Sequence, residues 1–159
     1  MDDNVESEEL LFMMKRISLD MTAQLEKRLG YKDLTGVQVY LLVYILRHHP
    51  DGTYLTELCR EIGVSKPTIS MLITKLRETR YLYFREDPAD VRKKKVLPTS
   101  KLMTEGEEFL KKADQMETEI CSVLDDQEKK QLWKLEKKIM MKFDGMEHKE
   151  KNRQEVYLP

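Results

Sequence analysis

Two groups of polar and basic side chains between residues 65 and 95 have the chemistry needed to contact nucleic acid. The first group recurs on one face of an expected helix, at Lys66, Thr68, Ser70, Met71, Thr74 and Lys75. The second is a run of four consecutive cations, at Arg92, Lys93, Lys94 and Lys95. Short polar and basic side chains of this kind reach phosphates and base edges. The sequence therefore predicts a surface that binds double-stranded DNA.

The first group requires a helix to present it, and residues 53–82 predict two short helices joined by a sharp turn. The first helix has an apolar stripe at Leu55, Leu58, Cys59 and Ile62. The second has an inward face at Ile69, Leu72, Ile73 and Leu76. Between them, Gly63 can adopt positive φ, and Ser65 can cap a helix that begins at about Lys66. This pattern predicts a helix-turn-helix, whose second helix fits the DNA major groove.

The second group requires a hairpin. The residues from Tyr81 to Glu86 have an alternating pattern and are rich in aromatic residues, which predicts a strand. Residues 87–90 predict a turn. The residues from Arg92 to Leu97 can then pair back as a second strand. Such a wing would bring its cations to the DNA backbone or to the narrow minor groove, whose negative potential favours arginine.

Three segments together resemble the multiple antibiotic resistance regulator (MarR) family of winged-helix transcription factors. They are LTGVQVYLLVYIL, TELCREIGVSKPTISMLITKL and DPADVRKKKVLPT, and the resemblance extends to about residue 144. It implies that Arg92 enters the minor groove and that Asp90 orients it. It also implies that the recognition helix reads the major groove with its N-terminal half, at Ser65, Lys66, Thr68, Ser70, Met71 and Lys75.

The sequence departs from the family pattern at three positions. Met71 stands where many members have arginine, so a polar contact would be lost or replaced by an apolar contact with a thymine methyl. Arg80 stands where a glycine commonly ends the recognition helix, so the chain either adopts a left-handed conformation there or ends the helix differently. Val91 replaces the middle cation of the wing motif.

The charged residues are unevenly distributed along the chain. The net charge is −1, but residues 53–101 contain 11 Lys or Arg and 6 Asp or Glu, a net of +5, while the remainder has a net of −6. A basic region of this kind gains free energy on a duplex by counterion release. The 159 residues suit a single domain. No apolar run approaches a membrane span and the start is acidic, so the sequence predicts a cytoplasmic protein without membrane contact.

Amphipathic helices flank the basic region. From Leu10 to Leu29 one apolar stripe includes Leu10, Met14, Ile17 and Met21, and near the C-terminus another includes Leu132, Trp133, Leu135, Ile139 and Phe143. These helices could cover the core of one subunit, but they carry more apolar surface than a small winged helix needs. We therefore predict a homodimer, which would bind a near-palindromic operator.

The predicted fold is mainly α with a small β-hairpin wing. Within one domain, residues 34–98 form the winged helix-turn-helix, residues 8–30 and 100–144 form dimerisation helices, and residues 145–159 form a disordered tail. The predicted function is that of a DNA-binding transcriptional regulator. The resemblance implies a repressor, released by a small-molecule effector whose site is unknown; Phe12, Tyr40 and Tyr44 fit either a ligand cleft or core packing.

Two other functions remain as alternatives. One is a winged-helix module that binds proteins instead of DNA, against which the retained cations argue. The other is a thiol-based redox sensor, but Cys59 lies on a buried stripe and Cys121 late in a helix, so both are expected to be structural. His48, His49 and His148 do not form a metal-ligand pattern, and no motif of an enzyme or of a cofactor site is present.

Overall fold

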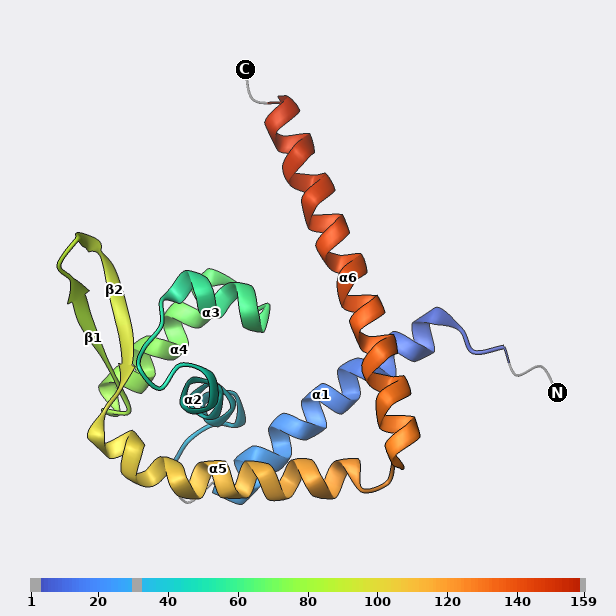
Figure 1. Ribbon diagram of the computed structural model, residues 1–159, viewed down its shortest axis with the longest axis horizontal. Coiled ribbons are helices and arrows are strands. Elements are labelled where there is room, and N and C mark those ends of the chain that lie inside the picture. Colours follow the sequence, from blue (N-terminus) through green and yellow to red (C-terminus); the bar gives the residue numbers. More distant parts are fainter. Residues whose placement is uncertain (1–3, 30–32, 158–159) are drawn as a thin grey trace. The chain divides into compact units, whose positions relative to one another are not determined.

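The computed structural model describes residues 4–29 and 33–157, which form six helices and a two-stranded antiparallel sheet (Figure 1). In chain order the elements are α1 (Ser7–Leu29), α2 (Gly36–His48), α3 (Leu55–Ile62), α4 (Lys66–Glu78), β1 (Leu82–Asp87), β2 (Asp90–Pro98), α5 (Ser100–Cys121) and α6 (Asp126–Tyr157). The predicted class, mainly helical with a β-hairpin wing, is confirmed. None of the helices in the described ranges is long and apolar enough to cross a membrane.

The chain divides into two compact units, residues 1–116 and 117–159, where a single domain was expected. The division follows the burial of α5, whose last buried residue is Met116. From Glu117 to Glu147 the described side chains are exposed, apart from the half-buried Leu124. The two units are therefore described separately.

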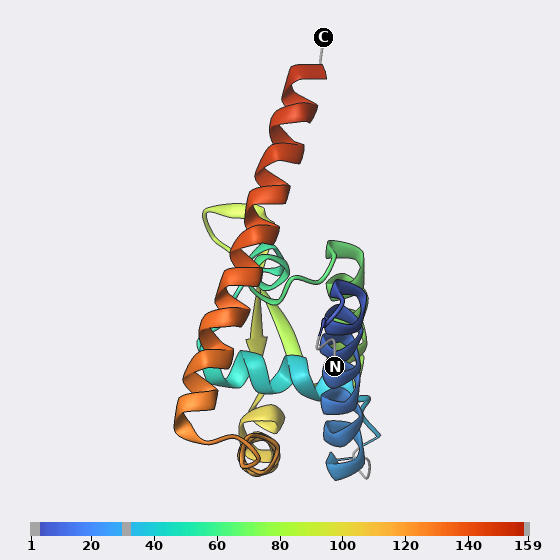
Figure 2. The same cartoon turned by 90° about the vertical axis from the view of Figure 1, so that its right-hand side faces the viewer.

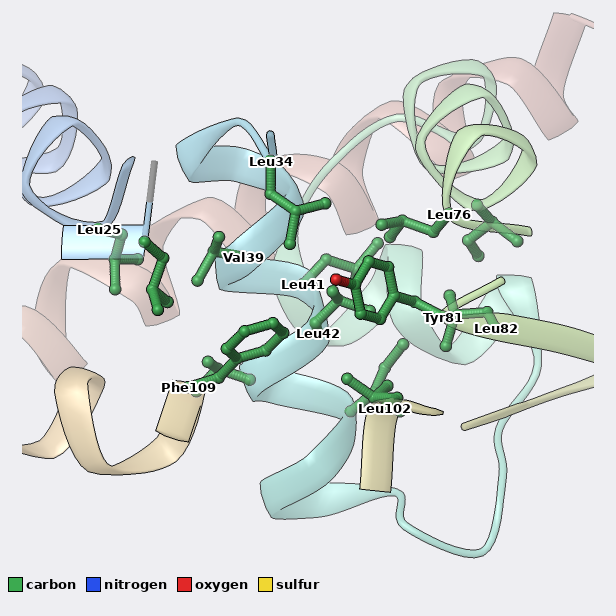
Figure 3. Close-up of a cluster of buried hydrophobic side chains, with 14 of the residues drawn as sticks. Leu25, Leu34, Val39, Leu41, Leu42, Leu76, Tyr81, Leu82, Leu102 and Phe109 are labelled. Carbon is green, nitrogen blue, oxygen red and sulfur yellow. The ribbon is translucent and has the colours of Figure 1, made fainter. Parts of the chain in front are cut away.

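The core of the first unit is built around α2, which lies among α1, α3, α4 and α5 (Figures 1 and 2). Helix α2 contributes Val39, Leu41, Leu42 and Ile45, all at most 1% exposed. Figure 3 shows these leucines beside Leu76 of α4, Tyr81, and Leu102 and Phe109 of α5. Because α4 and the base of the β-hairpin both contribute to this core, their positions are fixed by its packing.

Helix α2 begins with a reciprocal capping box. The Thr35 hydroxyl accepts a hydrogen bond from the Gln38 amide, and the Gln38 side chain accepts one from the Thr35 amide. At the next position, Gly36 lies against α1, where an added Cβ would be 2.1 Å from the Thr22 carbonyl oxygen. A side chain at this position would therefore collide with the backbone of α1.

Helix α1 is buried only at its C-terminal end, through Leu25 and Leu29. The predicted dimerisation residues nearer the N-terminus are all exposed, with 51% of Leu10, 40% of Met14, 52% of Ile17 and 39% of Met21 accessible. The rest of the apolar stripe is therefore uncovered among the described residues of this unit.

Helix α6 begins with another capping box, in which Asp125 and Glu128 each accept a hydrogen bond from the other's backbone amide. Its predicted dimerisation residues are exposed, at Leu132, Trp133, Leu135, Ile139 and Phe143. A disordered tail was expected from residue 145, whereas α6 is assigned as far as Tyr157. The tail is rich in Glu, Lys, Gln and Arg, which favour helix, and has no proline before Pro159.

Candidate nucleic-acid interface

The turn before α4 has the geometry that its residues predicted. Gly63 adopts φ +81° in the left-handed region and ends α3, with its amide bonded to the Cys59 carbonyl. Val64 then packs half-buried against the core. Ser65 caps α4, because its side chain accepts a hydrogen bond from the Thr68 amide. Helix α4 therefore begins at Lys66, as expected.

Helix α4 has two distinct faces. Ile69, Ile73 and Leu76 are buried, with at most 1% of each accessible, and Leu72 is half-buried beside them. The residues predicted to contact DNA are all exposed: Ser65, Lys66, Thr68, Ser70, Met71, Thr74 and Lys75. Met71 is 55% exposed, so a thioether, not a charge, occupies the middle of this face.

Helix α4 ends in a left-handed residue that is not glycine. Arg80 has φ +64°, and its amide is bonded to the Arg77 carbonyl, while the Tyr81 amide is bonded to the Leu76 carbonyl. This is the Schellman arrangement, which usually places glycine where Arg80 stands. Of the two outcomes left open by the sequence, the chain therefore adopts the left-handed conformation.

The wing is attached to the body at its base. Thr53 and Val96 exchange two backbone hydrogen bonds, of 2.9 and 2.7 Å, so a residue before α3 extends the sheet by one bridge. Tyr54 adds a long hydrogen bond of 3.4 Å from its hydroxyl to Asp87. Burial raises the pKa of the Tyr54 phenol, and the negative charge of Asp87 raises it further.

The register of the hairpin changes near its tip. Pairing is regular from Leu82–Pro98 to Glu86–Lys94, but the next pair is Asp87–Asp90, so residues 91–93 have no partners on β1. Aspartates on both sides stabilise this tip: Asp87 accepts a hydrogen bond from the Ala89 amide, and Asp90 accepts one from the Arg92 amide. Arg92 therefore lies in an irregular segment of the kind that redirects side chains.

A basic hollow of about 280 Å³ lies between α4, the start of α3 and the wing. Of the predicted DNA-contact residues, it brings together Lys66, Ser70 and Thr74 of α4 with Arg92, Lys93 and Lys94 of the wing. Its remaining lining residues were not predicted and are Tyr54, Leu55, Thr56 and Phe84. The only sequence signal for Tyr54 and Thr56 is that they are polar residues at the start of α3.

The other predicted residues do not line the hollow. Ser65 and Thr68 share a hydrogen bond of 2.8 Å at the start of α4, and Met71 and Lys75 lie on exposed parts of the helix. Lys95 is half-buried, with its side chain next to Gly52. It is therefore a weaker candidate for DNA contact than the three cations before it.

The remaining candidate groups lie elsewhere. Glu61 of α3 accepts hydrogen bonds from Tyr44 and His49, which hold the pKa of its carboxyl below the ordinary value. Of the two cysteines expected to be structural, Cys59 is half-buried and Cys121 is exposed. Of the aromatics considered for a ligand cleft, Phe12 and Tyr40 are 65% and 47% exposed, so neither is packed in the core. The described residues contain no His, Cys, Asp or Glu cluster able to hold a metal ion.

A helix-turn-helix followed by a two-stranded wing, with cations gathered between them, defines the fold of a winged-helix protein. Residues 32–93 match the model of the MarR family, although no curated protein matches the sequence. The chain is thus similar to the MarR family over the helix-turn-helix and the start of the wing, and its fold is that of winged-helix MarR structures.

Solved structures share this fold. The chain is similar to MepR of S. aureus in a complex with DNA, with 24% identity over 87% of this chain and 99% of that chain, at a TM-score of 0.77. It is also similar to the transcription regulator MarR from Oenococcus oeni, with 23% identity over 83% and 98% of the two chains and a TM-score of 0.72. A MarR protein from Peptoclostridium difficile has 21% identity over 92% and 94%, with a TM-score of 0.79.

Proposed function

We propose that this protein is a sequence-specific transcriptional regulator that binds a near-palindromic operator as a homodimer. The observation that carries the proposal is the basic hollow, where Lys66 of α4 lies on the same concave surface as Arg92, Lys93 and Lys94 of the wing. Cations from two elements arranged in this way can follow a phosphate backbone. The similarity to MepR, whose structure was solved with DNA, supports the same use of the surface.

In this proposal α4 reads the major groove. Its exposed hydroxyls at Ser65, Thr68, Ser70 and Thr74 can bond to phosphates or base edges, and Lys66 and Lys75 supply charge. Met71 offers an apolar contact to a thymine methyl, where an arginine would read guanine. An operator with thymine opposite Met71 is therefore expected.

The wing provides the second contact. Arg92 at the irregular tip would enter the minor groove, and Asp90 would orient it by holding the Arg92 amide. Lys93 and Lys94 would neutralise flanking phosphates, since both line the hollow.

The homodimer is proposed because α1 and α6 each carry apolar side chains that are exposed in the described part of the chain. On α1 these include Phe12 at 65% and Ile17 at 52%; on α6 they include Trp133 at 60% and Phe143 at 58%. Exposed apolar surface of this extent is typical of an interface. Light scattering should give twice the chain mass of 18.9 kDa; a mass of one chain at micromolar concentration would contradict the dimer.

We further propose repression, with release by a small molecule, on the resemblance to the family. The DNA upstream of the protein's own gene is the first operator to test. A mobility-shift experiment at two salt concentrations, with an unrelated duplex as competitor, should give a discrete complex that resists the competitor. Equal, salt-sensitive binding to both duplexes would contradict sequence specificity at this site. An absence of binding at low salt would instead favour a protein-interaction module.

A further inference from the structure

The aromatic ring of Phe84 lies where the wing meets the recognition helix. Phe84 is on β1, half-buried, and packs against the edge of the core. It also lines the basic hollow together with Ser70 and Thr74 of α4. The ring is therefore placed between the two elements proposed to read different grooves.

Two cations from different elements lie over this ring. The guanidinium carbon of Arg77, on α4, is 4.0 Å from the ring centroid, and the ammonium of Lys94, on β2, is 5.8 Å from it. Lys94 reaches the ring as a diagonal neighbour, because Phe84 pairs with Val96 in the sheet. Both distances lie within the range in which the negative face of an aromatic ring attracts a cation.

Two polar attachments of the wing lie away from this contact. The backbone bonds between Thr53 and Val96 hold the base of β2, and Tyr54 reaches Asp87 with a long bond. Neither of these attachments involves α4. Beyond the Glu86–Lys94 pair, the regular register ends, and the segment carrying Arg92 begins. The Arg77–Phe84–Lys94 group thus joins α4 to the wing just before the tip.

We propose that Phe84 is a positioning residue for DNA binding, whose ring holds Arg77 and Lys94 and so fixes the wing at a set distance from the recognition helix. The proposal rests on the DNA-binding function proposed above. It adds that the affinity for the operator depends on an aromatic ring that need not touch DNA itself. The ring also keeps two positive charges together on the face where the phosphates would approach.

The first test is operator affinity, measured by fluorescence anisotropy on Phe84→Leu and Phe84→Tyr. Leucine retains apolar packing but loses the ring, so affinity should fall about three- to tenfold, the loss expected for weak cation–π contacts. Tyrosine retains the ring and should bind within about twofold of the parent. Tyr83→Leu is the matched control, because Tyr83 is the neighbouring aromatic on the opposite side of β1 and 42% exposed.

The second test asks whether Phe84 acts through the wing tip. Phe84 and Arg92 should be coupled: Arg92→Ala should cost less affinity in the Phe84→Leu background than in the parent, since an unpositioned wing gains less from its arginine. A purely structural effect of Phe84 on overall stability would leave the Arg92 penalty unchanged. Additive losses would therefore overturn the proposal.

The third test needs no DNA. In the free protein, amide hydrogen exchange of residues 84–96 should be faster in Phe84→Leu than in the parent, and close to the parent in Phe84→Tyr and Tyr83→Leu. If Phe84→Leu does not fold, Arg77→Gln removes the α4 cation at an exposed position and should loosen the same amides. Unchanged exchange in the folded variant would overturn the proposal. If the parent itself binds no operator while Phe84→Leu loosens the wing, the DNA-binding function fails and the role of Phe84 in holding the wing stands.

Discussion

The carboxylate of Asp90 holds the backbone of Arg92, with Oδ1 3.0 Å from the Arg92 amide nitrogen. The contact through which this aspartate would orient Arg92, as the family resemblance implies, is therefore a main-chain hydrogen bond at the wing tip. Asp87 does the same for Ala89 across the turn, at 2.9 Å. The guanidinium of Arg92 thus extends from a backbone that is fixed on both sides of the turn.

Arg92→Ala should weaken operator binding by about 1 to 3 kcal/mol, because the narrow minor groove concentrates negative potential on an inserted arginine. The loss should be larger for a duplex with A·T-rich flanks than for one with G·C-rich flanks. Fluorescence anisotropy on both duplexes measures it. Arg16→Ala is the charge-matched control, since Arg16 is exposed on α1 and paired with Asp20. Equal binding by the parent and a folded Arg92→Ala would show that the wing tip does not enter the groove.

Lys66→Ala should weaken binding to all duplexes to a similar degree, because a lysine that meets a phosphate carries no sequence information. The slope of log affinity against log salt should become shallower by about one unit. Titrations at several salt concentrations measure this slope. Lys130→Ala on α6 removes the same charge at an exposed position and should leave the slope as it is. A change limited to one operator sequence would instead assign Lys66 to base readout.

Gly36→Ala should lower the free energy of unfolding by about 1 to 3 kcal/mol, as overpacking does, because the new methyl would meet the Thr22 backbone. Gly63→Ala is the comparison at a site with open space, where a Cβ meets nothing within 4 Å and only the φ of +81° is strained. Its cost should be about 1 kcal/mol. Urea unfolding at one fixed protein concentration separates the two, and a Gly36→Ala protein as stable as the parent would refute the close approach of α1 and α2.

The stability of the protein should depend on Glu61 at acid pH. Hydrogen bonds from His49 and Tyr44 hold the pKa of Glu61 below its ordinary value of 4.5. A depressed carboxyl pKa stabilises the fold above that ordinary value, and the contribution is lost as the pH falls through the lower, folded value. Urea midpoints on both sides of pH 4.5 should therefore fall less steeply toward acid in Glu61→Gln than in the parent.

Two comparisons complete this pH test. Glu107→Gln, an exposed carboxylate of α5, should keep the acid dependence of the parent. At alkaline pH, burial and the bond to Glu61 raise the pKa of Tyr44 from 10 to about 12. The stabilisation from neutral Tyr44 is then complete below pH 10 and lost as the pH rises toward 12. If the urea midpoints of Glu61→Gln and of the parent fell equally steeply below pH 4.5, the assigned role of Glu61 would be contradicted.

The helix-turn-helix could be predicted from the sequence because its signals are local. Gly63 supplies the left-handed residue, Ser65 the cap, and the apolar spacing the buried face, so that the start of α4 at Lys66 follows from neighbouring residues. The two strands of the wing were predictable for the same reason. Arg80 shows the limit of local signals, since the sequence left two outcomes open and the packing of Tyr81 into the core fixed one of them.

The parts that could not be predicted depend on contacts between distant residues. Nothing in the spacing of Arg77, Phe84 and Lys94 indicates that one ring holds both cations, because the contact needs the final angle between helix and hairpin. The half-burial of Lys95 beside Gly52 likewise follows from where the wing folds back. The run of four cations looked uniform in the sequence, yet three of them line the hollow and one does not.

The displaced register of the hairpin has a consequence for how related regulators can diverge. Residues 91–93 are unpaired on β2, beyond the regular ladder that ends at Glu86–Lys94, while the anchoring bonds to Thr53 lie at the other end of the strand. Substitutions at residues 91–93 involve neither the ladder pairs nor the bonds to Thr53. The proposed minor-groove contact can therefore evolve separately from the stability of the fold that carries it.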